Sequence, residues 1–115
     1  MRRGDIYLVE YEPVRGGEAS QARPAVIVSN DGANAVVSRM GRGVITVVPL
    51  TSNTARVYPF QVLLPAAECG LPKDSKVQCE QVRALAEEQF LRHVGTVPRR
   101  RMAEIDAALR RHLAL

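Results

Sequence analysis

The chain has 115 residues, the size of one ordinary domain, so we expect a single domain spanning residues 1–115. Hydrophobic residues make up 46% of the chain and aromatic residues only 4%, which predicts a modest aliphatic core. The formal net charge of +4 favours a polyanionic partner such as RNA or DNA, although a solubility-related excess of positive charge or a GC-rich genome would also explain it. No apolar run approaches the roughly 18 residues of a membrane span, and no apolar signal segment follows Met1. We therefore expect a cytoplasmic protein that makes no membrane contact.

Metal and cofactor chemistry has little support in the sequence. Cys69 and Cys79 lie outside any CxxC spacing, and no His-x-x-x-His pair or acidic cluster accompanies them. The phosphate-binding patterns GxGxxG and GxxxxGK[ST] do not occur. His93 and His112 fall in a predicted strand and a predicted helix, neither beside a candidate nucleophile. We expect buried cysteines, no metal and no cofactor.

The first third of the chain alternates strands with long loops. Residues 5–11 alternate apolar and polar side chains, which predicts a strand with one solvent-exposed face. Residues 12–22 contain a proline, two glycines and polar side chains, and loops of this length are often functional. The apolar run 24–29 predicts a strand buried on both faces or facing a barrel interior. Residues 30–32 are a turn signal, and residues 32–42 predict a second flexible loop.

Short strands continue beyond this loop. Residues 44–50 are rich in β-branched side chains and predict a strand that ends, bulges or lies on an edge at Pro49. Residues 57–64 predict a further strand, in which Pro59 again indicates an edge or a bulge. Residues 76–81 alternate and predict one more.

Helical patterns are confined to the end of the chain. Residues 85–92 predict a short helix and residues 93–97 a last strand. Residues 99–114 give the clearest helix, because apolar side chains recur at spacings of three and four from Met102 to Leu113. The arginines at 99–101 oppose the helix dipole, which indicates a solvated basic end or a docking surface for an acidic partner. Together the elements predict an α+β fold that is mainly β, a small and strongly bent β-barrel with a short helix and a C-terminal amphipathic helix.

One arginine is placed as a phosphate ligand would be. Arg23 follows the polar loop and precedes Pro24, which holds its backbone extended at the start of a rigid strand. A surface arginine that merely flanks a strand is the alternative. Glu18 lies in the same loop, and Thr51 ends another strand. If these strand ends meet, Arg23 would neutralise charge on a reacting phosphodiester, Thr51 would donate a hydrogen bond to it, and Glu18 would orient Arg23 or take a proton.

Four motifs resemble those of the MazF (PemK-like) toxin family. They are Arg3-Gly4-Asp5-Ile6-Tyr7, Glu18-x4-Arg23-Pro24-Ala25-Val26-Ile27-Val28-Ser29, Val48-Pro49-Leu50-Thr51-Ser52 and Asp74-Ser75-x4-Glu80-Gln81-Val82-Arg83. The resemblance implies an SH3-like barrel, a homodimer and an endoribonuclease that cuts single-stranded RNA at a short sequence. It also implies metal-free cleavage to a 2′,3′-cyclic phosphate and a 5′-hydroxyl, and a cognate antitoxin that lays an acidic segment over the dimer.

The resemblance also assigns roles to residues. The family's essential arginine falls on Arg23, its catalytic threonine on Thr51, and an acidic position of its first loop on Glu18. Expected RNA contacts are Ser20, Gln21, Ser52, Asn53, Gln81 and Arg83, the last two from a segment that contacts substrate or supports the dimer. Because the pKa of arginine exceeds about 12, Arg23 suits an electrostatic stabiliser or proton donor, and the general base stays open.

Two other functions fit a small barrel. A CcdB-like topoisomerase poison would share the fold but would act through its C-terminal helix rather than a loop arginine. A non-catalytic nucleic-acid-binding barrel would need exposed aromatic side chains for base stacking, and this chain has few aromatic residues.

Overall fold

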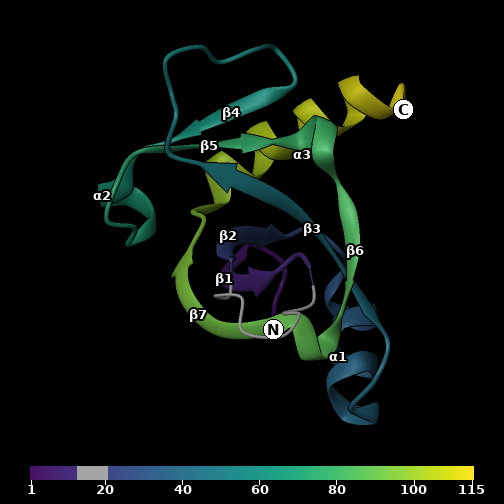
Figure 1. The fold of residues 1–115 in the computed structure, drawn as a ribbon. Coiled ribbons are helices and arrows are strands. Elements are labelled where there is room, and N and C mark those ends of the chain that lie inside the picture. Colours follow the sequence, from purple (N-terminus) through teal and green to yellow (C-terminus); the bar gives the residue numbers. More distant parts are fainter. Residues whose placement is uncertain (13–20) are drawn as a thin grey trace.

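The computed structural model describes residues 1–12 and 21–115 (Figure 1), and its elements alternate along the chain as an α+β fold. In order they are β1 (Asp5–Glu10), β2 (Ala22–Ile27), α1 (Asp31–Met40), β3 (Val44–Thr51), β4 (Gln61–Leu64), α2 (Ala66–Cys69), β5 (Ser75–Gln78), the 3-10 helix η1 (Cys79–Gln81), β6 (Arg83–Ala86), the 3-10 helix η2 (Glu87–Gln89), β7 (Phe90–Thr96) and α3 (Arg99–Leu113).

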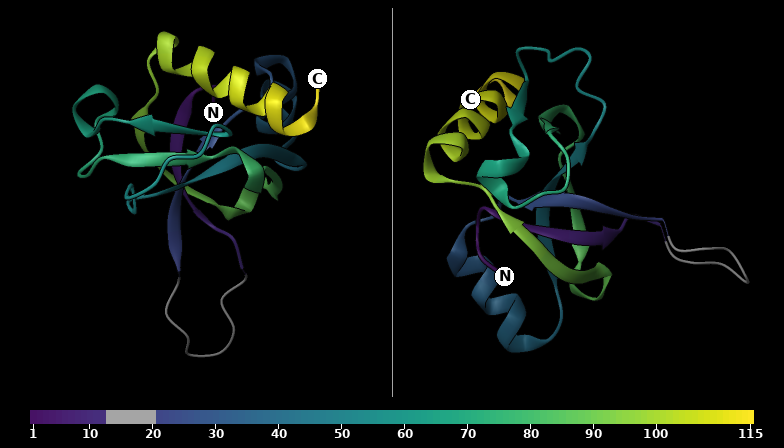
Figure 2. Two further views of the ribbon diagram at one scale, coloured as in Figure 1. Left: turned by 90° about the horizontal axis from the view of Figure 1, so that it is seen from above. Right: turned by 90° about the vertical axis from the view of Figure 1, so that its left-hand side faces the viewer.

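The strands form one strongly curved antiparallel sheet. Its order is β4-β5-β3-β2-β1-β7, and β6 pairs with β3 outside this path. Figures 1 and 2 show α3 at one end of the curved sheet and α1 at the other. Among the described strands β4 and β7 do not pair with each other, so the predicted mainly β fold is confirmed but the sheet is open rather than a closed barrel.

Strand β3 is the centre of this sheet. One of its edges pairs with β2, and its other edge pairs first with β6, up to Val47, and then with β5, from Leu50. Pro49 lies where the partner changes, with no residue of β5 or β6 opposite it. The missing N–H of Pro49 therefore removes no ladder bond on that edge. Of the predicted alternatives, an end or an edge strand at Pro49 is wrong, because β3 continues to Thr51 and is paired on both sides; the irregularity there is the change of partner from β6 to β5.

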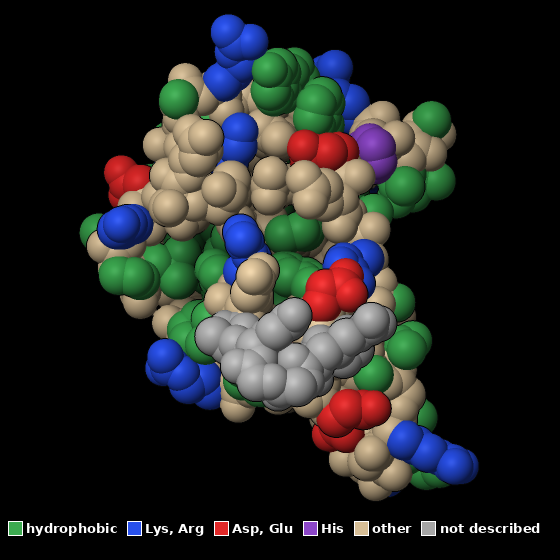
Figure 3. All heavy atoms as spheres, in the orientation of Figure 1, with side chains coloured by type: hydrophobic (Ala, Val, Ile, Leu, Met, Phe, Trp, Pro, Cys, Tyr) green, Lys and Arg blue, Asp and Glu red, His purple; other side chains and the backbone are tan. Residues whose placement is uncertain are grey.

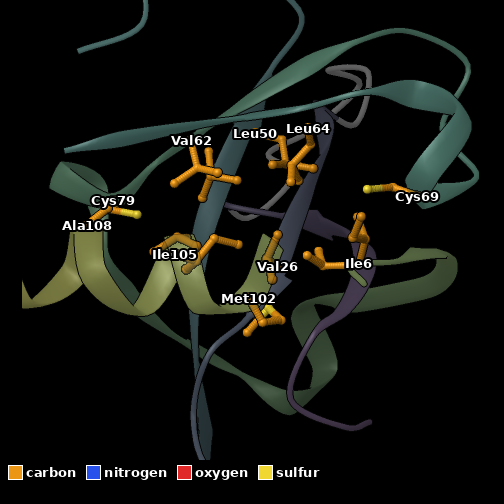
Figure 4. Packing of buried hydrophobic residues seen from close by; sticks show 13 residues of the cluster. Ile6, Val26, Leu50, Val62, Leu64, Cys69, Cys79, Met102, Ile105 and Ala108 are labelled. Atoms are coloured by element: carbon orange, nitrogen blue, oxygen red, sulfur yellow. The ribbon is translucent and has the colours of Figure 1, made fainter. Parts of the chain in front are cut away.

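The core has two parts, one on each face of the central strands. The part under α3 includes Ile6, Val26, Val48, Leu50, Val62, Leu64, Met102, Ile105 and Ala108 (Figure 4). The part near α1 consists of Val9, Ala25, Ile27, Val37, Ile45, Val47 and Leu85. Successive residues of β2 and β3 alternate between the two parts, which confirms that the strand predicted at 24–29 is buried on both faces, although β2 covers Ala22–Ile27.

The segment predicted as a turn and a flexible loop is helix α1, so that prediction was wrong. Asn30 is its N-cap, since its side-chain Oδ1 accepts the N–H of Ala33 at 2.8 Å. Gly41 ends the helix in the left-handed conformation, with φ +69°. Asn34 is only 1% exposed, and its side chain donates to the carbonyl of Ser29 at 2.9 Å. Asn30 of the predicted turn is thus the N-cap of α1, and Asn34 of the predicted loop ties the helix to Ser29.

The short helix predicted at 85–92 was also wrong. The segment is the end of β6, η2 and the start of β7. Leu85 is paired with Ile45 of β3, and Phe90 with Val9 of β1. These long-range pairings override a local helix preference. The strand predicted at 57–64 is shorter than expected, since β4 covers only Gln61–Leu64.

Helix α3 confirms the clearest prediction, because Met102, Ile105 and Ala108 face the core. The arginines at its N-terminal end are not simply exposed to solvent, because Arg100 and Arg101 both form ion pairs with Glu68 of α2. Arg101 also pairs with Glu104 at 3.1 Å. The ion pairs join the two helices and offset the unfavourable position of these charges at the helix start.

The predicted burial of both cysteines is confirmed. Burial raises the pKa of the Cys79 thiol to about 12, so that sulfur stays protonated. Within the described part of the chain, the helices are too short or too polar to traverse a bilayer.

Candidate functional site

Two adjoining hollows meet at Arg23, Leu50 and Thr51. The first, here called the glutamine hollow, has a volume of about 380 Å³ and is lined by Tyr11, Arg23, Pro49, Leu50, Thr51, Gln78, Gln81 and Arg83. The second, here called the lysine hollow, has a volume of about 230 Å³ and is lined by Arg23, Pro24, Leu50, Thr51, Ser52, Leu71, Pro72, Lys73 and Ser75. The two side chains expected to act on a phosphodiester thus border both spaces.

The register of the sheet explains why Arg23 and Thr51 meet. In the antiparallel β2–β3 ladder, Ala25 is opposite Pro49. Continuing this register by two residues puts Arg23 opposite Thr51, and a step of two keeps a side chain on the same face of its strand. The predicted convergence of the two strand ends is therefore confirmed.

Both groups are available to a ligand. Arg23 is exposed, and its guanidinium makes no ion pair or hydrogen bond with any residue in the described ranges. Thr51 is half-buried, and its Oγ1 accepts the backbone N–H of Asn53 at 3.2 Å. Since that bond uses an acceptor site of the hydroxyl, the Thr51 O–H is left to donate.

The other predicted contacts divide into three groups. Gln81 and Arg83 line the glutamine hollow, and Ser52 lines the lysine hollow. Asn53 lines neither and instead positions Thr51 through its backbone; Gln21 is exposed and also lines neither. Glu18 and Ser20 lie outside the described residues.

Tyr11 is a lining residue that the sequence analysis missed. Its ring lies 5.0 Å from the guanidinium carbon of Arg83, a cation–π contact. Its hydroxyl is buried and has no hydrogen-bond partner among the residues that the structure describes. Burial raises the pKa of Tyr11 to about 12, with Arg83 and then Arg23 acting in the opposite direction. Tyr11 therefore gives the hollow an uncharged aromatic wall at neutral pH.

Gln78 and Lys73 were missed as well. Gln78 ends β5 and lines the glutamine hollow, while Lys73 precedes β5 and lines the lysine hollow. Nothing in their local sequence marks them, because only the β3–β5 pairing brings this segment beside Thr51.

Charge at the surface is mixed rather than gathered in one basic patch. Figure 3 shows Lys and Arg side chains distributed over the face seen in Figure 1, with Asp and Glu side chains between them. Within residues 1–12 and 21–115, no three His, Cys, Asp or Glu side chains are grouped as metal ligands would be. The arrangement at Arg23 and Thr51 offers a cation and a hydroxyl donor to an anionic group.

Comparison with known proteins decides the family. Residues 2–113 match the family model described as PemK-like, MazF-like toxin of type II toxin-antitoxin system. The chain belongs to this family. The MazF-like motifs read from the sequence therefore identified the family correctly.

Relatives of this MazF-family toxin are similar along its whole length. It is 57% identical over 115 residues to endoribonuclease MazF9 of Mycobacterium tuberculosis, covering 100% of this chain and 98% of that protein. It is 31% identical over 109 residues to endoribonuclease MazF of Staphylococcus epidermidis, covering 95% and 88%.

Solved structures agree with the fold. An endoribonuclease in complex with its cognate antitoxin, from a mycobacterial species, superposes with a TM-score of 0.78 at 25% identity, covering 100% of this chain and 96% of that one. MazF of Deinococcus radiodurans gives a TM-score of 0.72 at 26% identity, covering 100% and 97%.

Proposed function

We propose that this MazF-family toxin cuts single-stranded RNA at a short sequence without a metal ion. Its activity is that of an endoribonuclease, since it belongs to the family and is 57% identical over its full length to a protein of that name. The ribose 2′-OH attacks the adjacent phosphorus, the P–O5′ bond breaks, and the products are a 2′,3′-cyclic phosphate and a 5′-hydroxyl. The nucleophile comes from the substrate, so the protein needs to supply only charge stabilisation and proton transfer.

The observation that carries this proposal is the position of Arg23 opposite Thr51 where the two hollows join. Arg23 neutralises the charge that develops on the pentacoordinate phosphorus, and its planar guanidinium can contact two phosphate oxygens at once. Thr51 donates a hydrogen bond to the same oxygens. Both contacts strengthen as charge develops, which lowers the barrier of the chemical step.

Two protons have to move during the reaction. The proton of the 2′-OH goes to a base, and the departing 5′ oxygen takes up a proton. An arginine is a poor base, so Arg23 is proposed as the donor to the 5′ oxygen. Glu18 is proposed to orient Arg23 or to accept the 2′-OH proton.

Substrate contacts are proposed on the walls around this pair. Gln81 and Arg83 contact RNA in the glutamine hollow, and Ser52 contacts it in the lysine hollow. Ser20 and Gln21 are proposed to contact the strand from the loop that precedes β2. Asn53 is proposed to contact RNA through its side chain, while its backbone N–H donates the hydrogen bond that positions Thr51.

We also propose that the toxin forms a homodimer and is neutralised by a cognate antitoxin. The support is the family and a solved mycobacterial relative described as an endoribonuclease in complex with its cognate antitoxin. A net charge of +4 suits an acidic antitoxin segment.

The test is cleavage of a long single-stranded RNA in EDTA, with both ends of the cuts mapped chemically. We expect cuts at one short sequence, ending in a 2′,3′-cyclic phosphate and a 5′-hydroxyl, and no cuts detectable in the same incubation time with Arg23→Ala. Arg99→Ala, at an exposed arginine on α3, is the matched control and should cut normally. Uncut RNA across varied sequences, or full cleavage by Arg23→Ala, contradicts the proposal. Poisoning of gyrase by the same preparation would support the CcdB-like alternative.

A further inference from the structure

The lysine hollow differs in chemistry from the glutamine hollow, although both border Arg23 and Thr51. The side chains that only the glutamine hollow contains include two amides, an aromatic ring and a guanidinium, which are groups that read and stack on bases. The side chains that only the lysine hollow contains are Pro24, Ser52, Leu71, Pro72, Lys73 and Ser75. This second set has one cation, two hydroxyls and an apolar wall, and it includes no amide or aromatic group.

Besides Arg23, which both hollows share, Lys73 is the charged group of the lysine hollow, and its charge is not neutralised within the described part of the chain. The ion pairs and side-chain hydrogen bonds there do not involve its ammonium group. The neighbouring carboxylate of Asp74 accepts the N–H of Ala66 at 2.8 Å. The hydroxyl of Ser75 donates to the carbonyl of Lys73 at 3.3 Å, which helps to fix the turn that carries the ammonium group.

We infer that the lysine hollow holds the backbone phosphate and ribose of the nucleotide next to the cut, with Lys73 as the phosphate contact. This inference rests on the proposed function, because the pair Arg23 and Thr51 fixes where the strand crosses the protein. An RNA strand held at Arg23 and Thr51 has to continue in both directions from the cut, and the two hollows are the spaces that open beside these residues. The volume of about 230 Å³ suits one sugar–phosphate unit, with the ribose against Leu71 and Pro72.

The two hollows therefore have different roles in RNA recognition. Base identity is read in the glutamine hollow, and the lysine hollow adds affinity that does not depend on sequence. A single lysine–phosphate contact releases about one counterion, so its loss should flatten the dependence of affinity on salt by about one unit of log K against log salt.

The experiment measures binding and cleavage separately. Binding is measured over a range of salt with an RNA that carries the cut sequence and a 2′-deoxynucleotide at the cut, which removes the nucleophile. We expect Lys73→Gln to weaken binding several-fold, to lower the salt slope by about one and to raise KM with little change in kcat. The map of cut sequences should stay unchanged. Lys73→Arg should restore affinity and slope, and Arg99→Gln should alter neither.

Gln78→Ala is the contrasting variant. It should keep the salt slope of the unaltered protein and relax or shift the preferred sequence, because Gln78 lies in the glutamine hollow. Thermal unfolding of all variants checks that each is folded.

Two results would overturn the inference alone, and a third would remove the proposed function as well. Unchanged affinity and salt slope for Lys73→Gln, in a preparation that cuts RNA, overturns the inference and leaves the proposed function in place. A changed cut sequence at an unchanged slope also overturns it, because the lysine hollow would then read bases. Failure of the unaltered protein to bind or cut any RNA removes the proposed function and the inference with it.

Discussion

Thr51 is the register partner of Lys76 in the β3–β5 ladder, and the Nζ of Lys76 donates to the carbonyl of Arg56 at 2.6 Å. The lysine is only 9% exposed, and its ammonium lies 5.8 Å from the centre of the Tyr58 ring. The buried ammonium of Lys76 therefore helps to hold in place the segment that begins directly after Thr51, the residue with the proposed catalytic hydroxyl. The hydrogen bonds from the N–H of Asn53 to Thr51 and from the N–H of Tyr58 to Gln61 also help to hold that segment.

Replacing Lys76 with methionine should loosen this segment. Lys76→Met keeps the length and apolar stem of the side chain but leaves the Arg56 carbonyl without its donor, at an expected cost of about 1–3 kcal/mol in the free energy of unfolding. We also expect a fall in kcat, since Asn53 in the loosened segment supplies a hydrogen bond to Thr51. Urea unfolding and RNA cleavage measure the two effects.

The chain's other lysine provides the control. Lys73 is exposed, so Lys73→Met should leave the unfolding free energy unchanged. A Lys76→Met protein as stable and as active as the unaltered one would show that the segment is held by other contacts.

Arg23 and Thr51 should behave as one catalytic unit. Removing the hydroxyl with Thr51→Val should lower kcat by about 10²–10³, the usual cost of losing one donor to a developing anion. Thr51→Ser keeps the hydroxyl and should cost much less. Arg23→Lys keeps the charge but loses the two-point fork, and we expect it to fall between the unaltered protein and Arg23→Ala.

A double variant tests whether Arg23 and Thr51 act together on the same charge or act independently. Because both side chains serve the same charge, Arg23→Ala combined with Thr51→Val should be only slightly slower than Arg23→Ala alone in single-turnover cleavage. A rate that falls by the full product of the two single losses would mean that the residues act at different steps.

Glu68 should make stability depend on acid pH. The hydrogen bond from Arg101 is the main cause that lowers the pKa of this carboxyl below its ordinary value of 4.5; burial opposes it, and the hydrogen bond from Arg100 lowers the pKa further. Between the folded and unfolded pKa values the unfolded chain binds more protons, so stability rises with pH there. The contribution is complete above the ordinary pKa and is lost as pH falls through the folded one.

Thermal unfolding of Glu68→Gln tests this expectation. The variant should melt below the unaltered protein at neutral pH, and the difference should disappear in strong acid. Glu88→Gln, at an exposed glutamate of η2, should show no such difference at any pH. A gap for Glu68→Gln that stays constant from neutral to acid pH would assign its effect to packing rather than to charge.

Gly95 should tolerate no side chain. A Cβ at this position of β7 would lie 2.3 Å from the carbonyl oxygen of Cys69, a backbone atom at the end of α2. Gly95→Ala has to push α2 away from β7, and we expect a loss of at least about 3 kcal/mol in the free energy of unfolding. Gly41→Ala meets no atom within 4 Å and should cost only about 1 kcal/mol, from its positive φ. Equal losses in the two variants would contradict a steric origin.

The local sequence was sufficient to predict those elements whose hydrophobic periodicity matches the environment in which they lie. The strand at 24–29 and the helix at 99–114 were predictable because their apolar residues repeat with the period of the structure they form. Helix α1 was not, since Asn30 and its neighbours have the same composition in a turn as in an N-cap. The segment 85–92 was not, because its strands exist only through pairing with β1 and β3.

The residues of the candidate site were likewise predictable only in part. Arg23 and Thr51 stand at strand ends in recognisable motifs, and the register of the β2–β3 ladder then places them together. Gln78 and Lys73 have no such signal, because their proximity to Arg23 depends on how β5 pairs with β3. Tyr11 has none either, and it comes near Arg23 through the pairing of β1 with β2. Register between distant strands is the information that a single sequence lacks.

The central place of β3 also bears on how the toxin is made. Its Thr51 emerges from the ribosome before β5 and β6, yet the walls of the glutamine hollow come from Gln78, Gln81 and Arg83. Strand pairings between distant parts of a chain form slowly. A chain that has emerged only as far as β3 therefore carries Arg23 and Thr51 without the rest of the site, and we expect RNA-cutting activity to begin only after β5 and β6 have emerged.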